Sequence, residues 1–113
     1  MSVTKAAVAA AAEKLGWSVR FDTQKSWSTG REEKYAEFEG CSPAGEDLIF
    51  TEFYHSLSDL PSLLYERYTD FDAEQHAMEN YGAKGAPDSL RVLLDDADAI
   101  EGMILDLSES LPS

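Results

Sequence analysis

Groups that could bind a metal or transfer protons are concentrated between Asp72 and Glu79. In a helix, Asp72, His76 and Glu79 would share one face, at positions i, i+4 and i+7. Carboxylates and imidazole are metal-ligand types, but the set lacks a second histidine or a cysteine. Asp72 also has an ordinary interpretation as a helix N-cap. We therefore interpret the segment as an exposed helix and predict no metal and no other cofactor.

Three further groups have residue types that could do chemistry. Asp95, Asp96 and Asp98 lie in a helical pattern and lack the glycine and the alternating oxygen ligands of a calcium loop. The glycine-containing segments 43–45 and 82–85 do not have the spacing of a phosphate-binding loop. Cys41 is the single cysteine, which excludes an internal disulfide, and its spacing from His55 does not indicate a catalytic pair. The sequence therefore predicts a protein that is not an enzyme.

The composition predicts one acidic, folded domain over residues 1–113. The net charge is -13, but 43% of the residues are apolar and the chain has five Phe, five Tyr and two Trp, unlike a disordered chain. No apolar stretch approaches the roughly 18 residues of a membrane span. The Ala-rich run at 6–12 is short for a secretory signal and continues into a helix end. We expect a cytoplasmic protein without membrane association.

Hydrophobic periodicity predicts an α+β fold, with an N-terminal helix, a three-stranded antiparallel sheet and several C-terminal helices packed on one face. The first helix is expected over 4–15, capped by Thr4 or Ser2 and ended by Gly16. Alternating apolar residues predict strands over 17–22 and 35–39, and the run of residues 48–54, rich in aromatic and aliphatic side chains, is the strongest strand signal in the chain. The polar segment 23–34 is interpreted as a long hairpin connection, and 41–45 as a turn.

The chain becomes helical from residue 58 onwards. Ser58 or Asp59 is expected to cap a helix with Pro61 in its first turn, and Asp72 a short helix that ends near Tyr81. After a loop at 82–87, Ser89 opens a region in which apolar residues recur at three- and four-residue spacing up to residue 111. Because aspartate is a good N-cap, the sequence leaves open whether this region is one helix or two.

The net negative charge is confined to the second part of the chain. Residues 1–40 carry six basic and six acidic residues, whereas residues 41–113 carry three basic and sixteen acidic residues. In the last helical region, four carboxylates fall opposite the apolar residues, and we call them the acidic ridge: Asp95, Asp98, Asp106 and Glu109. At ~1.5 Å per residue the ridge is roughly 21 Å long. Further carboxylates precede it in the sequence, at Asp70, Asp72, Glu74 and Glu79.

The acidic ridge has two interpretations. Duplex DNA carries about one charge per 1.7 Å of its axis, so a dense line of carboxylates could replace phosphates in the basic groove of a partner protein. Alternatively, the charge is the ordinary exposed face of an amphipathic helix and serves solubility. Direct binding to nucleic acid is not expected, because the chain has no basic patch. The oligomeric state stays open.

Trp27 lies in a polar, partly basic segment between residues 24 and 31. One interpretation is that the strands extend and the ring packs on the hairpin. The other is that Trp27 is a recognition anchor, because Trp and Arg are enriched at the energetic centres of interfaces. The second function hypothesis follows from it: a housekeeping or assembly module that binds a protein through the sheet face and Trp27.

Three segments carry a resemblance to a known group of proteins: Cys41–Asp47, Tyr68–His76, and Gly85–Ala97 with its Pro87, Ser89 and Asp96. Over roughly residues 16–111 the chain resembles a group of small acidic proteins carried on phages and conjugative elements of gut bacteria. That group has no assigned activity, so the resemblance implies no particular site residues. It implies a context: an accessory protein that acts against host defence by mimicking DNA, as anti-restriction and some anti-CRISPR proteins do.

Overall fold

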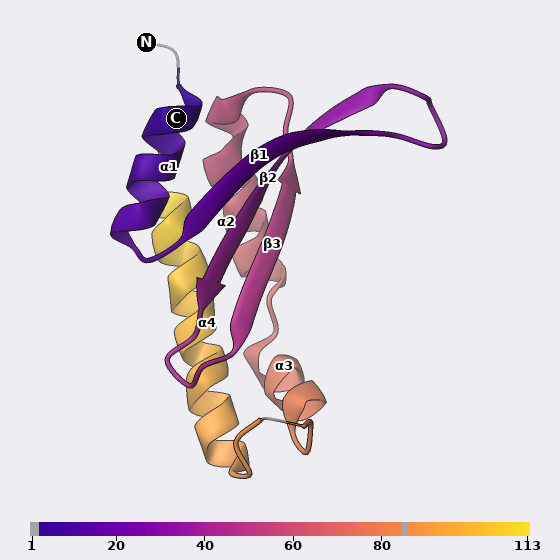
Figure 1. Cartoon of the computed structure of the whole chain (residues 1–113). Coiled ribbons are helices and arrows are strands. Elements are labelled where there is room, and N and C mark those ends of the chain that lie inside the picture. The colour runs from indigo at the N-terminus through magenta and orange to yellow at the C-terminus, as the bar shows by residue number, and fades with distance from the viewer. Residues whose placement is uncertain (1–2, 85) are drawn as a thin grey trace.

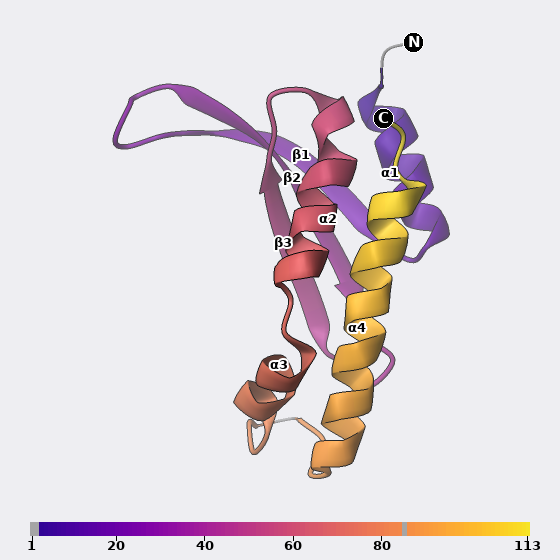
Figure 2. The ribbon, with the colours of Figure 1, turned by 180° about the vertical axis from the view of Figure 1, so that it is seen from behind.

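The computed structural model of the chain describes residues 3–84 and 86–113 and has the expected α+β order. Its elements are α1 (Lys5–Lys14), β1 (Ser18–Lys25), β2 (Glu32–Cys41), β3 (Asp47–Phe53), the 3-10 turn η1 (Leu57–Asp59), α2 (Leu60–Asp70), α3 (Ala73–Asn80) and α4 (Leu90–Ser110). The three strands form one antiparallel sheet in the order β1-β2-β3. Helices α1, α2 and α4 lie on one face of this sheet, and α3 lies beside the N-terminal end of α4 (Figures 1 and 2).

Polar side chains begin the helices largely as predicted. The Thr4 hydroxyl accepts a hydrogen bond from the Ala7 amide at 3.1 Å, Asp72 accepts from Gln75, and Ser89 accepts from Val92. The alternative cap of α1, Ser2, lies outside the described residues. Asp59 stands at the N-cap position of α2, with Pro61 in the first turn as predicted, but its side chain makes no capping bond to α2. The Asp59 carboxylate instead accepts a hydrogen bond from the amide of Ser56, which precedes η1. A 3-10 turn therefore precedes α2.

The β1–β2 hairpin is longer than the sequence predicted. Its strands pair from Ser18 opposite Glu39 to Lys25 opposite Glu32, so the predicted connection at 23–34 shrinks to the turn at 26–31. The outer part of the hairpin projects beyond the helices (Figure 1). Because both faces of such an arm are exposed, its strands need no apolar alternation, and the pattern on which strand prediction depends is missing.

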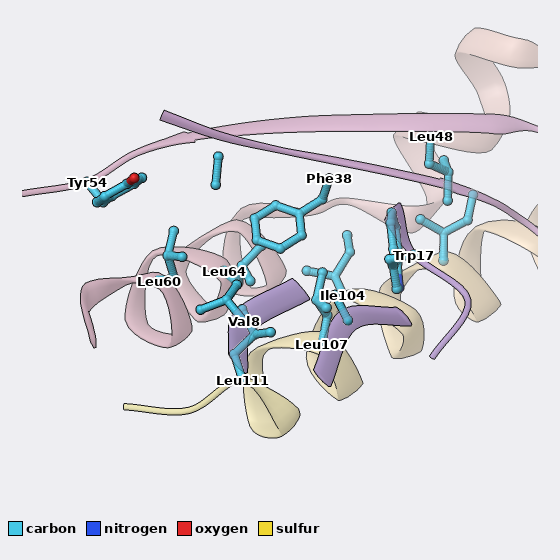
Figure 3. Packing of buried hydrophobic residues seen from close by; sticks show 13 residues of the cluster. Val8, Trp17, Phe38, Leu48, Tyr54, Leu60, Leu64, Ile104, Leu107 and Leu111 are labelled. Atoms are coloured by element: carbon cyan, nitrogen blue, oxygen red, sulfur yellow. The ribbon is translucent and has the colours of Figure 1, made fainter. Parts of the chain in front are cut away.

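The main core lies between the inner face of the sheet and the three helices. Phe38 of β2 is fully buried there above Leu64 of α2 and Ile104 of α4 (Figure 3). Trp17, only 2% exposed, packs against Phe50 with 5.6 Å between ring centroids. Position 40 has to be glycine, because a Cβ atom there would lie 2.7 Å from the Trp17 ring. The predicted packing of the C-terminal helices on one face thus holds for α2 and α4.

The last helical region is a single helix of 21 residues, which resolves what the sequence left open. Buried residues on both sides of Asp95 and Asp96, such as Leu93 and Ile100, belong to the same packed face, so a break between them would expose apolar area. No helix in the described part of the chain is both long and apolar enough to cross a membrane.

Candidate functional site

The four carboxylates of the acidic ridge are exposed on α4, and the buried side of the helix carries Leu93, Ile100, Ile104 and Leu107. Figure 2 shows α4 in front of the sheet, with its outward side uncovered by other elements. Among the described residues, none of the four carboxylates takes part in an ion pair. Arg91 is also exposed, one turn before Asp95. The ridge therefore carries net negative charge. Arg91 partly offsets this charge near Asp95, so the net negative charge is most concentrated from Asp98 to Glu109.

The other predicted carboxylates lie on different elements. Asp70 ends α2, Asp72 caps α3, and Glu74 and Glu79 are exposed on α3. α3 packs beside the N-terminal end of α4, where Ala77 forms a second core cluster with Leu93 and Ala97 (Figure 2), so these charges belong to neighbouring elements at that end of the helix. They do not prolong the line of the ridge towards Glu109.

The structure gives Asp72, His76 and Glu79 separate partners. Asp72 caps α3, and Glu79 accepts a hydrogen bond from Gln75 at 3.0 Å. His76 Nε2 lies 2.8 Å from Glu46 Oε2, which belongs to the β2–β3 loop thirty residues earlier. Within residues 3–84 and 86–113 no three His, Cys, Asp or Glu side chains are grouped as metal ligands. Spacing along the chain could not reveal the Glu46–His76 pair.

A cavity of about 210 Å³ lies between the β2–β3 loop, α3, the following loop and α4. Small residues form much of its wall: Ala44, Gly45, Ala77, Ala83, Ala86 and Pro87. Polar groups at the wall are Glu46, His76, Asn80, Lys84 and Asp96. Residues of three segments, 41–47, 68–76 and 85–97, contribute to it, although Gly85 lies outside the described residues. Pockets with a few convergent polar groups are the usual form of a small-ligand site.

Asp96 has a role that the helical pattern did not predict. It lies on α4 between the exposed residues Asp95 and Asp98, but it is only 8% exposed itself. Its carboxylate accepts hydrogen bonds from Ser42 Oγ at 2.7 Å and from the Ala44 amide at 2.9 Å. Ser42 Oγ in turn accepts from the Glu46 amide at 2.9 Å. Asp96 therefore fixes the β2–β3 loop to α4 and shapes one side of the cavity.

An Asp96→Ala variant is expected to lose about 2 kcal/mol of unfolding free energy, because two donors lose a charged acceptor in a poorly solvated place. Urea unfolding followed by circular dichroism measures this loss. The matched control is Asp95→Ala, since the neighbouring carboxylate is exposed and should change stability by less than about 0.5 kcal/mol. Equal stabilities of the two variants would show that the loop is not held by Asp96.

Trp27 is 97% exposed, so the prediction that its ring packs on the hairpin is wrong. The turn around it is ordered by several hydrogen bonds: the Gly30 amide donates to the Ser26 carbonyl at 2.7 Å, and the Ser26 amide donates to the Arg31 carbonyl at 2.9 Å. The indole thus stands at the end of a hydrogen-bonded arm. Such a large apolar side chain, left in water, is typical of an interface anchor.

The outer face of the sheet carries mixed side chains. Ile49 is 58% and Phe53 43% exposed, and the Phe53 ring lies 5.6 Å from that of Tyr35. Beside them, Arg20 donates to Glu37 at 2.6 Å. This is the sheet face of the second function hypothesis. Part of this face is apolar, and part of it carries oppositely charged side chains that pair with each other.

One buried charge lies on the inner face of the sheet. The side chain of Glu52 is 8% exposed and accepts a hydrogen bond of 2.5 Å from Arg67 Nε, while Arg67 also donates to the Thr51 carbonyl. Burial raises the pKa of the Glu52 carboxyl above its usual range, and the hydrogen bond from Arg67 acts in the opposite direction. The pair joins α2 to β3 and is structural rather than a candidate site.

No protein-family model, no curated protein and no solved structure matches this chain. The features of this chain that could carry a function are the acidic ridge, the Trp27 arm and the cavity.

Proposed function

We propose that this protein is a non-enzymatic interaction protein whose acidic ridge binds a basic surface of another protein. The observation that carries the proposal is the placement of Asp95, Asp98, Asp106 and Glu109 along the exposed side of one uninterrupted helix, without compensating ion pairs among the described residues. A continuous helix gives the charges a fixed spacing over roughly 21 Å. Such a line of negative charge is complementary to a basic groove that binds phosphates.

The class of partner follows from the same charge. A basic groove that holds nucleic acid is the surface on which a rigid line of carboxylates competes with a phosphate backbone. Together with the resemblance to accessory proteins of phages and conjugative elements, this supports a protein of host defence, such as a nuclease, as the partner. The binding would block the groove by charge mimicry.

The ridge-reversed variant, in which Asp95, Asp98, Asp106 and Glu109 are all changed to Lys, is expected to lose partner binding. The wild type and the variant are immobilised side by side, and a bacterial host lysate is applied at low salt. Proteins that the wild type retains should elute as salt rises from about 50 to 300 mM, because exposed charges are screened. The ridge-reversed variant should retain them at least about tenfold less.

The matched control has the same change in net charge at another place. Glu13, Glu32, Glu33 and Glu39 are exposed and belong to α1 and the hairpin strands, so a variant with these four changed to Lys keeps the ridge. It should retain the same proteins as the wild type. If the control loses them equally, or if elution does not depend on salt, the ridge is not the binding surface.

A second candidate function rests on the exposure of Trp27. The module would then bind through the hairpin arm, and the acidic residues would serve solubility. Trp27→Ala, tested in the same experiment, separates the two candidates. Under this candidate it loses the retained proteins while the ridge-reversed variant keeps them.

A further inference from the structure

We propose that the cavity between the β2–β3 loop, α3 and α4 binds a guanidinium group. The site is separate from the acidic ridge, because no ridge residue lines it. The guanidinium can belong to a free small molecule or to an arginine side chain of a protein. The inference does not depend on the proposed function.

The space exists because the surrounding side chains are small. Ala77 is 1% exposed and belongs, with Leu93 and Ala97, to the second core cluster, so this wall is packed and apolar. The opposite wall is the β2–β3 loop, which Asp96 holds through Ser42 and Ala44. A volume of about 210 Å³ between two fixed walls can take a planar group together with a short alkyl chain.

The polar atoms at the wall are mainly hydrogen-bond acceptors. Since a carboxylate can only accept, the 2.8 Å contact with Glu46 Oε2 requires the hydrogen on His76 Nε2. In the described part of the chain, Glu46 Oε1 accepts no hydrogen bond. Asn80 Nδ2 donates to the His76 carbonyl at 2.9 Å, so its Oδ1 is also left to accept. A ligand with several N–H donors can donate hydrogen bonds to both of these oxygens.

The charges at the wall favour a cation. Glu46 and Asp96 carry negative charge there, and Lys84 carries the positive charge. Asp96 uses its hydrogen bonds within the protein, but its charge still acts on the cavity through a region of low dielectric. The His76 ring is held between Glu46 and Phe71, whose ring centroid is 5.2 Å away, so Glu46 has a fixed position. A guanidinium, with five donors in a planar fork, matches this arrangement better than a compact ammonium.

The test is a titration of the isotope-labelled full chain with N-acetylarginine amide, followed by amide NMR signals. Signals of Gly45, His76 and Asn80 should shift and saturate. N-acetylcitrulline amide, which has nearly the same shape without charge, and inorganic phosphate should leave them unchanged. Glu46→Gln should weaken binding at least about tenfold, and Lys84→Gln should strengthen it about threefold, because the two changes shift the charge of the cavity in opposite directions.

The source of the guanidinium is distinguished by a second probe. A Gly-Arg-Gly peptide that binds more tightly than agmatine indicates an arginine of a protein, and the reverse order indicates a free small molecule. The ridge-reversed variant should bind the probes at the cavity as the wild type does, so failure of the proposed function leaves this test intact. The inference is overturned if the cavity signals do not shift at about 10 mM probe, if citrulline binds equally, or if Glu46→Gln has no effect.

Discussion

A Phe38→Ala variant is expected to lose about 4 kcal/mol of unfolding free energy, the largest stability effect of any change considered for this chain. Phe38 is fully buried in the centre of the sheet, where α2 and α4 meet it (Figure 3). The loss combines the transfer of a large apolar side chain with the cavity left between rigid elements. Urea unfolding measures this loss directly. The folded state of the variant is expected to be only marginally stable near room temperature.

The matched control for Phe38→Ala is Phe53→Ala on the outer face of the same sheet. Phe53 is 43% exposed and contacts Tyr35, so its removal should cost less than about 1.5 kcal/mol. A similar loss for the two variants would mean that the sheet is covered on its outer face as well. The outer face of the sheet would then be a buried surface and not an exposed one.

Replacing Arg67 by Met is expected to cost about 3 kcal/mol at neutral pH. The change leaves the buried Glu52 carboxylate without its ion partner, which is more harmful than losing the whole pair. The value is placed at the lower end of the usual range because the Arg67 side chain is 36% exposed. The double variant Glu52→Gln/Arg67→Met should be more stable than Arg67→Met alone, which a double-mutant cycle quantifies.

The pH dependence of the Arg67→Met variant has a definite sign. Burial raises the pKa of Glu52 in the folded state above 4.5, its ordinary value, so the folded state holds the proton more tightly than the unfolded chain does. Stability from this group is present below the ordinary pKa and is lost as the pH rises through the folded pKa. Without Arg67 the folded pKa rises further. The loss relative to wild type should therefore shrink as the pH falls towards 4.5; a constant loss would contradict this mechanism.

The elements that the sequence predicted well are those with one buried face. α4 carries its apolar residues at helical spacing from Leu93 to Leu107, and β3, with Leu48 on the buried face, has the β-branched and aromatic residues typical of a strand. The outer hairpin was interpreted as a connection because its strands have no buried face. Whether α4 breaks near Asp95 depends on packing against α2 and α3, which no local pattern contains.

The two candidate sites also differ in how far the sequence could predict them. The acidic ridge belongs to a single helix, so its exposure followed from periodicity alone. The cavity combines residues from Ala44 to Asp96 that meet only in the folded chain, and its Glu46–His76 contact spans thirty residues. The helical pattern cannot reveal the burial of Asp96, because its hydrogen-bond donors, Ser42 and Ala44, lie more than fifty residues earlier in the chain.

The charges of α4 oppose the helix dipole. Its last turn has Glu109 and no basic residue, and its first turn has Arg91 and no acidic residue. The carbonyl end of a helix is partially negative, so carboxylates there cost typically a few tenths of a kcal/mol each. Stability alone would place them at the other end. A cationic surface bound at Asp106 and Glu109 would neutralise the carboxylates and face the partially negative end of the helix, so the end of α4 would be more stable in the complex.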